Sequence, residues 1–204
     1  APPPRLPRGA RAPAGGRGPR PGLPRRIAAG DVAGAHAAQN RAVGLTLALA
    51  APCAVAFVVL PDLILGALFR RGAFDAAAVQ RSAAVLAAYA IALPASVILR
   101  SVTASFYSRQ DTATPLWASF AGYAVNIALK ILLIGRFGVV GLALATSVGA
   151  WTNVVILWVL ALRRGFAGPS RALLLTLAAI AAGCAVLALL GLFGRGPAEA
   201  WIAP

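Results

Sequence analysis

The chain has 204 residues, of which 60% are hydrophobic and 12% charged, and its mean hydropathy is +0.81. Soluble domains carry about twice that share of charged residues, so the composition indicates an integral membrane protein. The net charge of +14 does not indicate nucleic-acid binding, because seven of the nineteen basic residues lie in the first 26 positions without interleaved aromatic residues, and most others flank apolar stretches.

Residues 1–22 consist of Ala, Pro, Arg, Gly and Leu alone. This composition has too little apolar bulk to fold, so we expect a disordered tail. It does not resemble a signal peptide, because no apolar core follows its charges. Two explanations stay open. A shifted reading frame or an incorrect start in a GC-rich gene would produce this composition, and so would a functional basic arm.

Five apolar stretches follow, each close to the roughly 20 residues that a helix needs to cross the bilayer core. They are residues 43–60, 83–99, 116–134, 141–162 and 172–193. These stretches are apolar on all sides rather than alternating, so they predict helices and not barrel strands. Pro52 and Pro94 fall inside the first two, and each predicts a kink that serves either packing or a hinge.

Short polar connections join the stretches and carry candidate helix caps. Asp62, after Pro61, is expected to cap a helix start in preference to coupling protons, and Asp75 is expected to cap a helix that begins at Ala76 after a turn at Gly72.

In the next connection, Thr114 is expected to cap a helix with Pro115 at its first position. Asp111 lies close enough in sequence to pair with Arg109.

Arginine placement predicts the orientation in the membrane. The N-terminal side of the first stretch carries eight arginines and the opposite side five, so the positive-inside rule places the former in the cytoplasm. The eight are Arg25, Arg26, Arg41, Arg100, Arg109, Arg163, Arg164 and Arg171, and the five are Arg70, Arg71, Arg81, Arg136 and Arg195.

The connections carry a family resemblance. The most specific string is Phe-Tyr-Ser-Arg-Gln-Asp-Thr-Ala-Thr-Pro at 106–115, and further matching strings occupy 23–31, 39–42, 69–74 and 138–147. In this order they resemble the C-terminal half of the MurJ/MviN lipid II flippases, members of the MATE-like MOP exporter superfamily.

The resemblance implies an all-α polytopic bundle and an activity. Such flippases have two six-helix lobes and two extra helices, and they move lipid-linked peptidoglycan precursor across the bacterial inner membrane by alternating access. Residues 23–164 would form four helices of a partial second lobe. Residues 165–204 would hold the first extra helix and a truncated end. The N-terminal lobe, with the family's cavity arginines, would be a missing partner of this chain.

Three residues are candidates for substrate contact. Lys130, with Asn126 one turn before it, either faces a cavity or extends its ammonium to the interface. Arg100 either contacts a headgroup or anchors the span end. The matched loop motif adds a final set: Arg109, Gln110, Asp111, Thr112, Thr114 and Pro115.

Enzymatic chemistry, a metal and a cofactor are not indicated. His36 is the single histidine, and no nucleophile and base occur together. Cys53 and Cys184 are expected to be small apolar fillers.

The small residues Gly141, Ala145 and Gly149, spaced by four, predict close helix packing. The preferred function is that of a lipid II flippase fragment, whose partners are the lipid-linked precursor and membrane lipids. An exporter of another lipid-linked saccharide, or a non-transporting scaffold or gene remnant, stays open.

Overall fold

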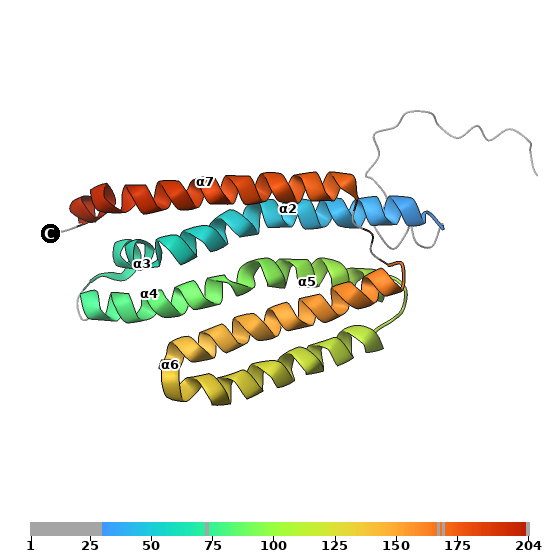
Figure 1. The fold of residues 1–204 in the computed structure, drawn as a ribbon, viewed down its shortest axis with the longest axis horizontal. Helices are drawn as coiled ribbons and strands as arrows, with labels where there is room; N and C mark the ends of the chain where they lie inside the picture. The colour runs from blue at the N-terminus through green and yellow to red at the C-terminus, as the bar shows by residue number, and fades with distance from the viewer. Residues whose placement is uncertain (1–29, 72–73, 167, 169, 203–204) are drawn as a thin grey trace, which may run out of the picture.

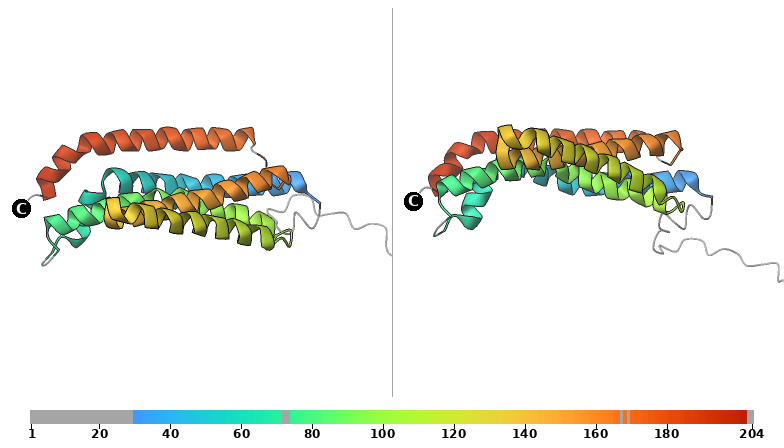
Figure 2. Two further views of the ribbon diagram at one scale, coloured as in Figure 1. Left: turned by 60° about the horizontal axis from the view of Figure 1, so that its bottom comes forward. Right: turned by 90° about the horizontal axis from the view of Figure 1, so that it is seen from below.

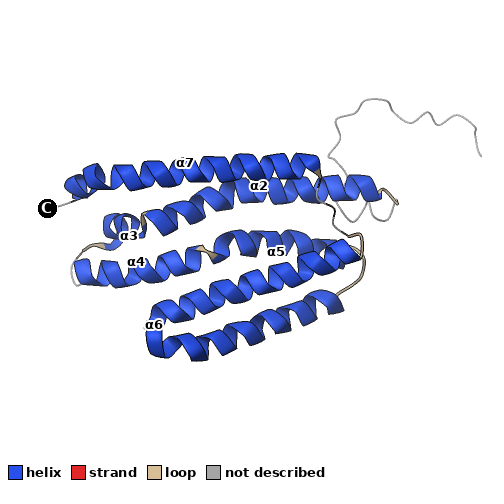
Figure 3. Cartoon of the chain, viewed as in Figure 1, coloured by secondary structure: helices blue, strands red, loops and turns tan. Residues whose placement is uncertain are grey.

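The computed structural model describes residues 30–71, 74–166, 168 and 170–202. The predicted tail at 1–22 and the turn at Gly72 lie outside the described residues. In the described part the structure consists of helices, which confirms the all-α prediction (Figures 1 and 3). They are α2 (Val32–Val59), α3 (Pro61–Phe69), α4 (Ala76–Ala90), α5 (Ala92–Tyr107), α6 (Ala113–Arg163) and α7 (Arg171–Ile202).

The long helices lie roughly side by side along the longest axis of the molecule, with α7 outermost beside α2 and the α6 hairpin at the opposite edge (Figures 1 and 2). Helix α2 packs against α5 and α7, and α6 packs against both α4 and α5. Among the described residues, four helical segments are long and apolar enough to cross a membrane: Val32–Val59, Ala76–Tyr107, Ala113–Arg163 and Arg171–Gly194.

Helix α6 is a hairpin of two antiparallel arms, which brings the number of candidate crossings to the predicted five. Its 51 residues are interrupted at Gly138, where φ is 54° and ψ is −133°. Side chains with a Cβ avoid this backbone conformation, so glycine permits the reversal. Figure 1 shows the two arms, 113–137 and 139–163, running back along each other.

The first crossing begins earlier than hydropathy predicts. Helix α2 starts at Val32 rather than near residue 43, and the Asp31 side chain accepts a hydrogen bond of 2.8 Å from the Gly34 N–H at its start. Hydropathy marks the apolar stretch alone, whereas the helix also includes the polar turn around Gln39 and Asn40, both of which are buried. The helix ends at Val59 because Leu60 precedes a proline, which disfavours helical backbone at Leu60.

The two predicted acidic caps have different outcomes. Asp75 is the N-cap of α4, and its Oδ1 accepts from the Ala78 N–H at 2.8 Å, as predicted. The prediction for Asp62 was wrong, because Leu60 occupies the N-cap position of α3 and Pro61 its first turn. Asp62 lies within that first turn, where a carboxylate is favourable beside the positive end of the helix dipole.

The two prolines also differ. Helix α2 continues through Pro52, although Figure 1 shows its axis changing direction in the second half. The second span breaks at Ile91, three residues before Pro94, and this separates α4 from α5. The break confirms the predicted kink, because proline lacks the N–H that would bond the carbonyl four residues earlier.

In the described part of the chain, buried apolar side chains gather in two small clusters. One joins α5 to both arms of α6, and the other joins α2 to α7. Their buried members are Val102, Phe106, Ala118, Leu157 and Ala161 in the first, and Val43, Leu47 and Leu173 in the second. Many large apolar side chains are exposed, among them Trp117 (71%) and Ile131 (72%), as expected for a surface that faces lipid.

Small residues hold the arms of α6 close together, as predicted. A Cβ built on Gly149 would lie 2.7 Å from the Asn126 Cβ, and one built on Gly141 would lie 2.7 Å from the Leu133 carbonyl oxygen. Ala145 is fully buried. The two cysteines are free thiols, and Cys53 is exposed, so it fills no internal gap there.

Candidate functional site

The connection between α5 and α6 holds a group of linked polar contacts, and Asp111 lies at its centre. Its N–H donates to the Phe106 carbonyl at 3.1 Å, which closes the turn after α5, and Gln110 takes a positive φ of 61°. The Asp111 carboxylate accepts from the Thr114 N–H at 3.0 Å and from the Thr114 hydroxyl at 2.7 Å. Asp111 therefore caps the start of α6.

The predicted roles of Thr114 and Pro115 need correction. Helix α6 begins at Ala113 with Thr112 as the N-cap residue, so Pro115 occupies the third helical position rather than the first. Proline is tolerated there because the first four N–H groups of a helix have no intrahelical partner. Thr114 is capped by Asp111 and is not itself the cap.

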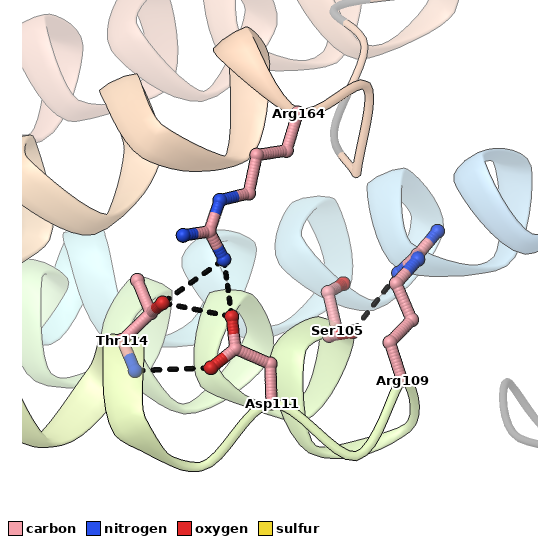
Figure 4. Close-up of polar contacts among 5 residues, drawn as sticks. All are labelled: Ser105, Arg109, Asp111, Thr114 and Arg164. Carbon is pink, nitrogen blue, oxygen red and sulfur yellow. Dashed lines mark hydrogen bonds and ion pairs between the residues drawn. The ribbon is translucent and has the colours of Figure 1, made fainter.

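The ion pair of Asp111 is also different from the predicted one. Arg164, at the end of α6, donates through Nη1 to Asp111 Oδ2 and, at 3.0 Å, to the Thr114 hydroxyl. We call Asp111, Thr114 and Arg164 the clamp (Figure 4). It joins the first turn of α6 to its last residues and so closes the open end of the hairpin.

Arg109 points away from Asp111 in Figure 4. Its Nη1 donates to the Ser105 carbonyl at 2.9 Å, and its guanidinium carbon lies 4.3 Å from the centroid of the Phe166 ring. Phe166 in turn packs edge-on against Phe106 at 5.4 Å. Arg109 therefore attaches the connection to the segment after α6 through a cation–π contact rather than through a carboxylate.

Hydrogen bonding sets the charge state of Asp111. Bonds from the Thr114 N–H and hydroxyl, with a further contribution from Arg164, lower the pKa of the Asp111 carboxyl below its ordinary value of 3.8. These donors favour the ionised form, so the Asp111 carboxylate stays negatively charged beside Arg164 throughout the neutral range. Gln110 and Thr112 are exposed, whereas Pro115 is buried.

The three candidate substrate contacts are not gathered into one site. Lys130 lies about 17 residues into α6, roughly 25 Å from its start, whereas Arg100 lies roughly 10 Å before the end of α5. The backbones of the two residues therefore differ in depth by roughly 15 Å. Arg100 is exposed and Lys130 half-buried.

Asn126 faces the other arm of the hairpin, where it packs at Gly149. Among the described residues its buried Oδ1 has no hydrogen-bond partner, and the same is true of the Asn153 Oδ1. The Asn153 amide donates to the Ser119 hydroxyl at 3.3 Å. A role for Arg100, Lys130 or Asn126 in substrate contact stays a prediction.

Comparison with known proteins identifies the family. The family model described as lipid II flippase MurJ matches residues 21–202, which is most of the chain. The chain belongs to the MurJ family. It is 39% identical over 145 residues to a probable lipid II flippase MurJ of Rhizobium tropici, covering 71% of this chain and 27% of that protein.

Other relatives give the same result. A probable lipid II flippase MurJ of Rhizobium meliloti is 32% identical over 168 residues, covering 82% of this chain and 31% of that protein. The chain therefore spans between a quarter and a third of the length of these curated MurJ relatives. As a member of this family with apolar helices long enough to span a bilayer, it is a membrane protein.

A solved structure supports the fold. The lipid II flippase MurJ in an inward closed conformation superposes with a TM-score of 0.63 and 22% sequence identity, covering 85% of this chain and 42% of that one. At this identity the likeness concerns the fold alone.

Three residues that bond across the described helices were not predicted from the sequence. Arg164 lies 53 positions from Asp111, so no local pattern pairs them. Ser147 donates to the Ala88 carbonyl at 2.6 Å and Trp151 to the Ile91 carbonyl at 2.9 Å, and both acceptors lie at the α4–α5 break. For Ser147 and Trp151, Pro94 was the available sequence signal, because a broken helix leaves carbonyls that need hydrogen-bond donors.

Proposed function

We propose that this chain supplies helices of a lipid II flippase that moves lipid-linked peptidoglycan precursor across the bacterial inner membrane. The observation that carries the proposal is the family match over residues 21–202. Alternating access needs two bundles that move against each other around a shared site. In this proposal the chain acts together with further helices of a flippase. Residues 23–164 provide part of one lobe, and α7 provides a helix peripheral to that lobe.

The arrangement of charges supports the need for further helices. A pyrophosphate in a low-dielectric cavity requires several cationic partners, because an unpaired buried charge is very costly. Within the spans described here, Lys130 and Arg100 are the candidates, and they lie at different depths. In our proposal most cationic groups that hold the substrate come from other helices.

A split-protein experiment tests the proposal. The host flippase is depleted in cells that express this chain, with or without the part of the Rhizobium tropici relative that the chain does not match. We expect growth and outward movement of lipid-linked precursor when both parts reach normal membrane levels, and no growth with this chain alone. The intact relative is the positive control.

Two outcomes would contradict the proposal. If the pair fails while the intact relative succeeds and both parts are present, the chain is not a working part of a lipid II flippase. If the chain alone sustains growth, a multimer must build the cavity from several copies. Restored export of a different lipid-linked saccharide, without movement of lipid II, would favour that alternative substrate.

Lys130 gives a finer test of substrate contact. In a paired system that supports growth, Lys130→Ala should reduce precursor movement if the ammonium faces the cavity, and Lys130→Arg should retain more of it. Equal activity of both variants and the parent would favour an ammonium that extends to the interface. Arg100→Gln makes the same test for Arg100, the candidate that lies at a different depth from Lys130.

A further inference from the structure

The α4–α5 break lies at the middle of a 32-residue apolar segment, Ala76–Tyr107, and therefore deep in the bilayer. Ile91 separates the two helices, and Pro94 cannot donate to the Ala90 carbonyl. The end of a helix leaves its last four carbonyls without intrahelical donors, and hydrocarbon offers no water to replace them. A break at this depth requires donors from elsewhere in the protein.

The second arm of α6 supplies two donors. The Ser147 hydroxyl donates to the Ala88 carbonyl at 2.6 Å, and the Trp151 indole N–H donates to the Ile91 carbonyl at 2.9 Å. Ser147 and Trp151 are four residues apart and so lie on one face of the helix. Ser147 is 1% exposed, and we call this pair of bonds the latch.

The surroundings leave room for movement. An open groove of about 390 Å³ lies beside the break and is lined by Ile91, Ser147, Val148 and Trp151, among others. The two half-spans share α2 and α6 as neighbours, but α4 also packs against α3, whereas α5 packs more extensively than α4 against both α2 and α6. A change of angle at Ile91 would therefore move α4 with α3 while α5 stays against α2 and α6, and the contacts of α4 with α6 and α2 would have to slide.

We propose that the α4–α5 break is a hinge and that Ser147 and Trp151 form its latch. With the latch closed, the span keeps the angle seen here. When both bonds open, the α4 half turns about Ile91, and the freed carbonyls must find other donors. Few residues absorb the change, as in other hinge motions. In a flippase this hinge serves alternating access, and that part of the inference rests on the proposed function.

Distance measurements between spin labels test the hinge on the full 204-residue chain in lipid nanodiscs. Labels are placed at two exposed positions on either side of the break, Gln80 and Ala104, in a background where Cys53 and Cys184 are alanine. We expect one main distance in the parent. The Ser147→Ala/Trp151→Phe variant should lose part of that peak to a second population at a different distance.

Two further variants make the result decisive. Thr152→Val is the matched control, because the Thr152 hydroxyl bonds the Val148 carbonyl of its own helix and so contributes nothing to the latch. It should keep the parental distribution. Pro94→Ala should shift the distance toward about 36 Å, the separation of 24 residues in an uninterrupted helix.

An unchanged distribution in the double variant, with helix content retained by circular dichroism, would overturn the latch. If the double variant does not fold, the single variants Ser147→Ala and Trp151→Phe decide the question by the same criterion. A distribution in Thr152→Val as broad as in the double variant would also overturn it. The labels report the hinge without any transport, so a failure in the split-protein experiment and a failure here are separate results.

Discussion

The two ends of the α6 hairpin are held together by different kinds of interaction. At the open end the clamp joins Asp111 and Thr114 to Arg164 through charged hydrogen bonds. From the Gly138 turn inward, the arms approach through glycine, with Gly149 packed on Gly122 and Asn126. Polar bonds suit the end that meets water, and close packing suits the part in lipid, where no hydrophobic effect drives helices together.

The two ends of the hairpin should lie on opposite sides of the membrane, and thiol labelling of each end should show which one is cytoplasmic. The clamp end carries more arginine, so we expect it to be cytoplasmic. In a background with Cys53 and Cys184 replaced by alanine, Arg136→Cys near the turn should react with an impermeant thiol reagent in intact cells, whereas Arg163→Cys should not. Both should react after permeabilisation, and the reverse pattern in intact cells would invert the orientation.

The packed part of the hairpin should be the more sensitive to substitution. Gly149→Ala places a Cβ 2.7 Å from the Asn126 Cβ and 2.9 Å from the Gly122 carbonyl oxygen. We expect a loss of about 1–3 kcal/mol in the free energy of unfolding in detergent, because overpacking forces the arms apart.

Gly183→Ala is the matched control for Gly149→Ala, since nothing lies within 4 Å of a Cβ at that position of α7. It should be neutral or slightly stabilising, because alanine favours helix over glycine. Equal stability of the two variants would show that close packing of the arms is not required.

The clamp should contribute less to the free energy of unfolding than the packed part of the hairpin. We expect Asp111→Asn and Arg164→Ala each to reduce the free energy of unfolding by about 1 kcal/mol, the size of a helix cap or an exposed ion pair. The double variant should lose less unfolding free energy than the two single variants together, because both changes remove the same bond. Arg163→Ala, a change in the exposed neighbouring arginine, is the control.

Asp111→Asn also separates a structural role from a gating role. In a paired system that supports growth, a purely structural clamp tolerates this variant when its membrane level is normal. Loss of growth at a normal level would instead assign the clamp to the transport cycle.

The pH dependence should be the smallest effect. Because folding lowers the pKa of Asp111 below 3.8, its contribution to stability is fully present above that value and is lost as the pH falls through the folded-state pKa. Between pH 7 and pH 3 the parent should lose slightly more stability than Asp111→Asn. A parallel loss in the two proteins would mean that Asp111 is not stabilised by folding.

Much of the fold follows from local sequence. Apolar length predicted the five crossings, Asp75 capped the helix it precedes, and Pro94 marked the break in the second span. These features depend on residues within one or two helical turns, where backbone geometry and the lack of a proline N–H act directly.

The candidate site follows much less from sequence. Local spacing favoured Arg109 as the partner of Asp111, but the structure pairs Asp111 with Arg164 across 53 positions. The distant pair depends on the hairpin, since Gly138 must reverse the chain before the end of α6 can meet its beginning. Likewise, the donors at the α4–α5 break come from Ser147 and Trp151, whose roles depend on which faces of two helices meet.

The single-residue reversal at Gly138 also fixes the rotational phase of the second arm. Each added residue turns everything after it by about 100° about the helix axis and shifts it by about 1.5 Å. An insertion between Gly138 and Gly141 would therefore carry Gly149 away from Gly122 and present a bulky neighbour instead. Natural variants of this hairpin should accumulate substitutions on its lipid-facing sides while keeping the number of residues between Gly122 and Gly149 constant.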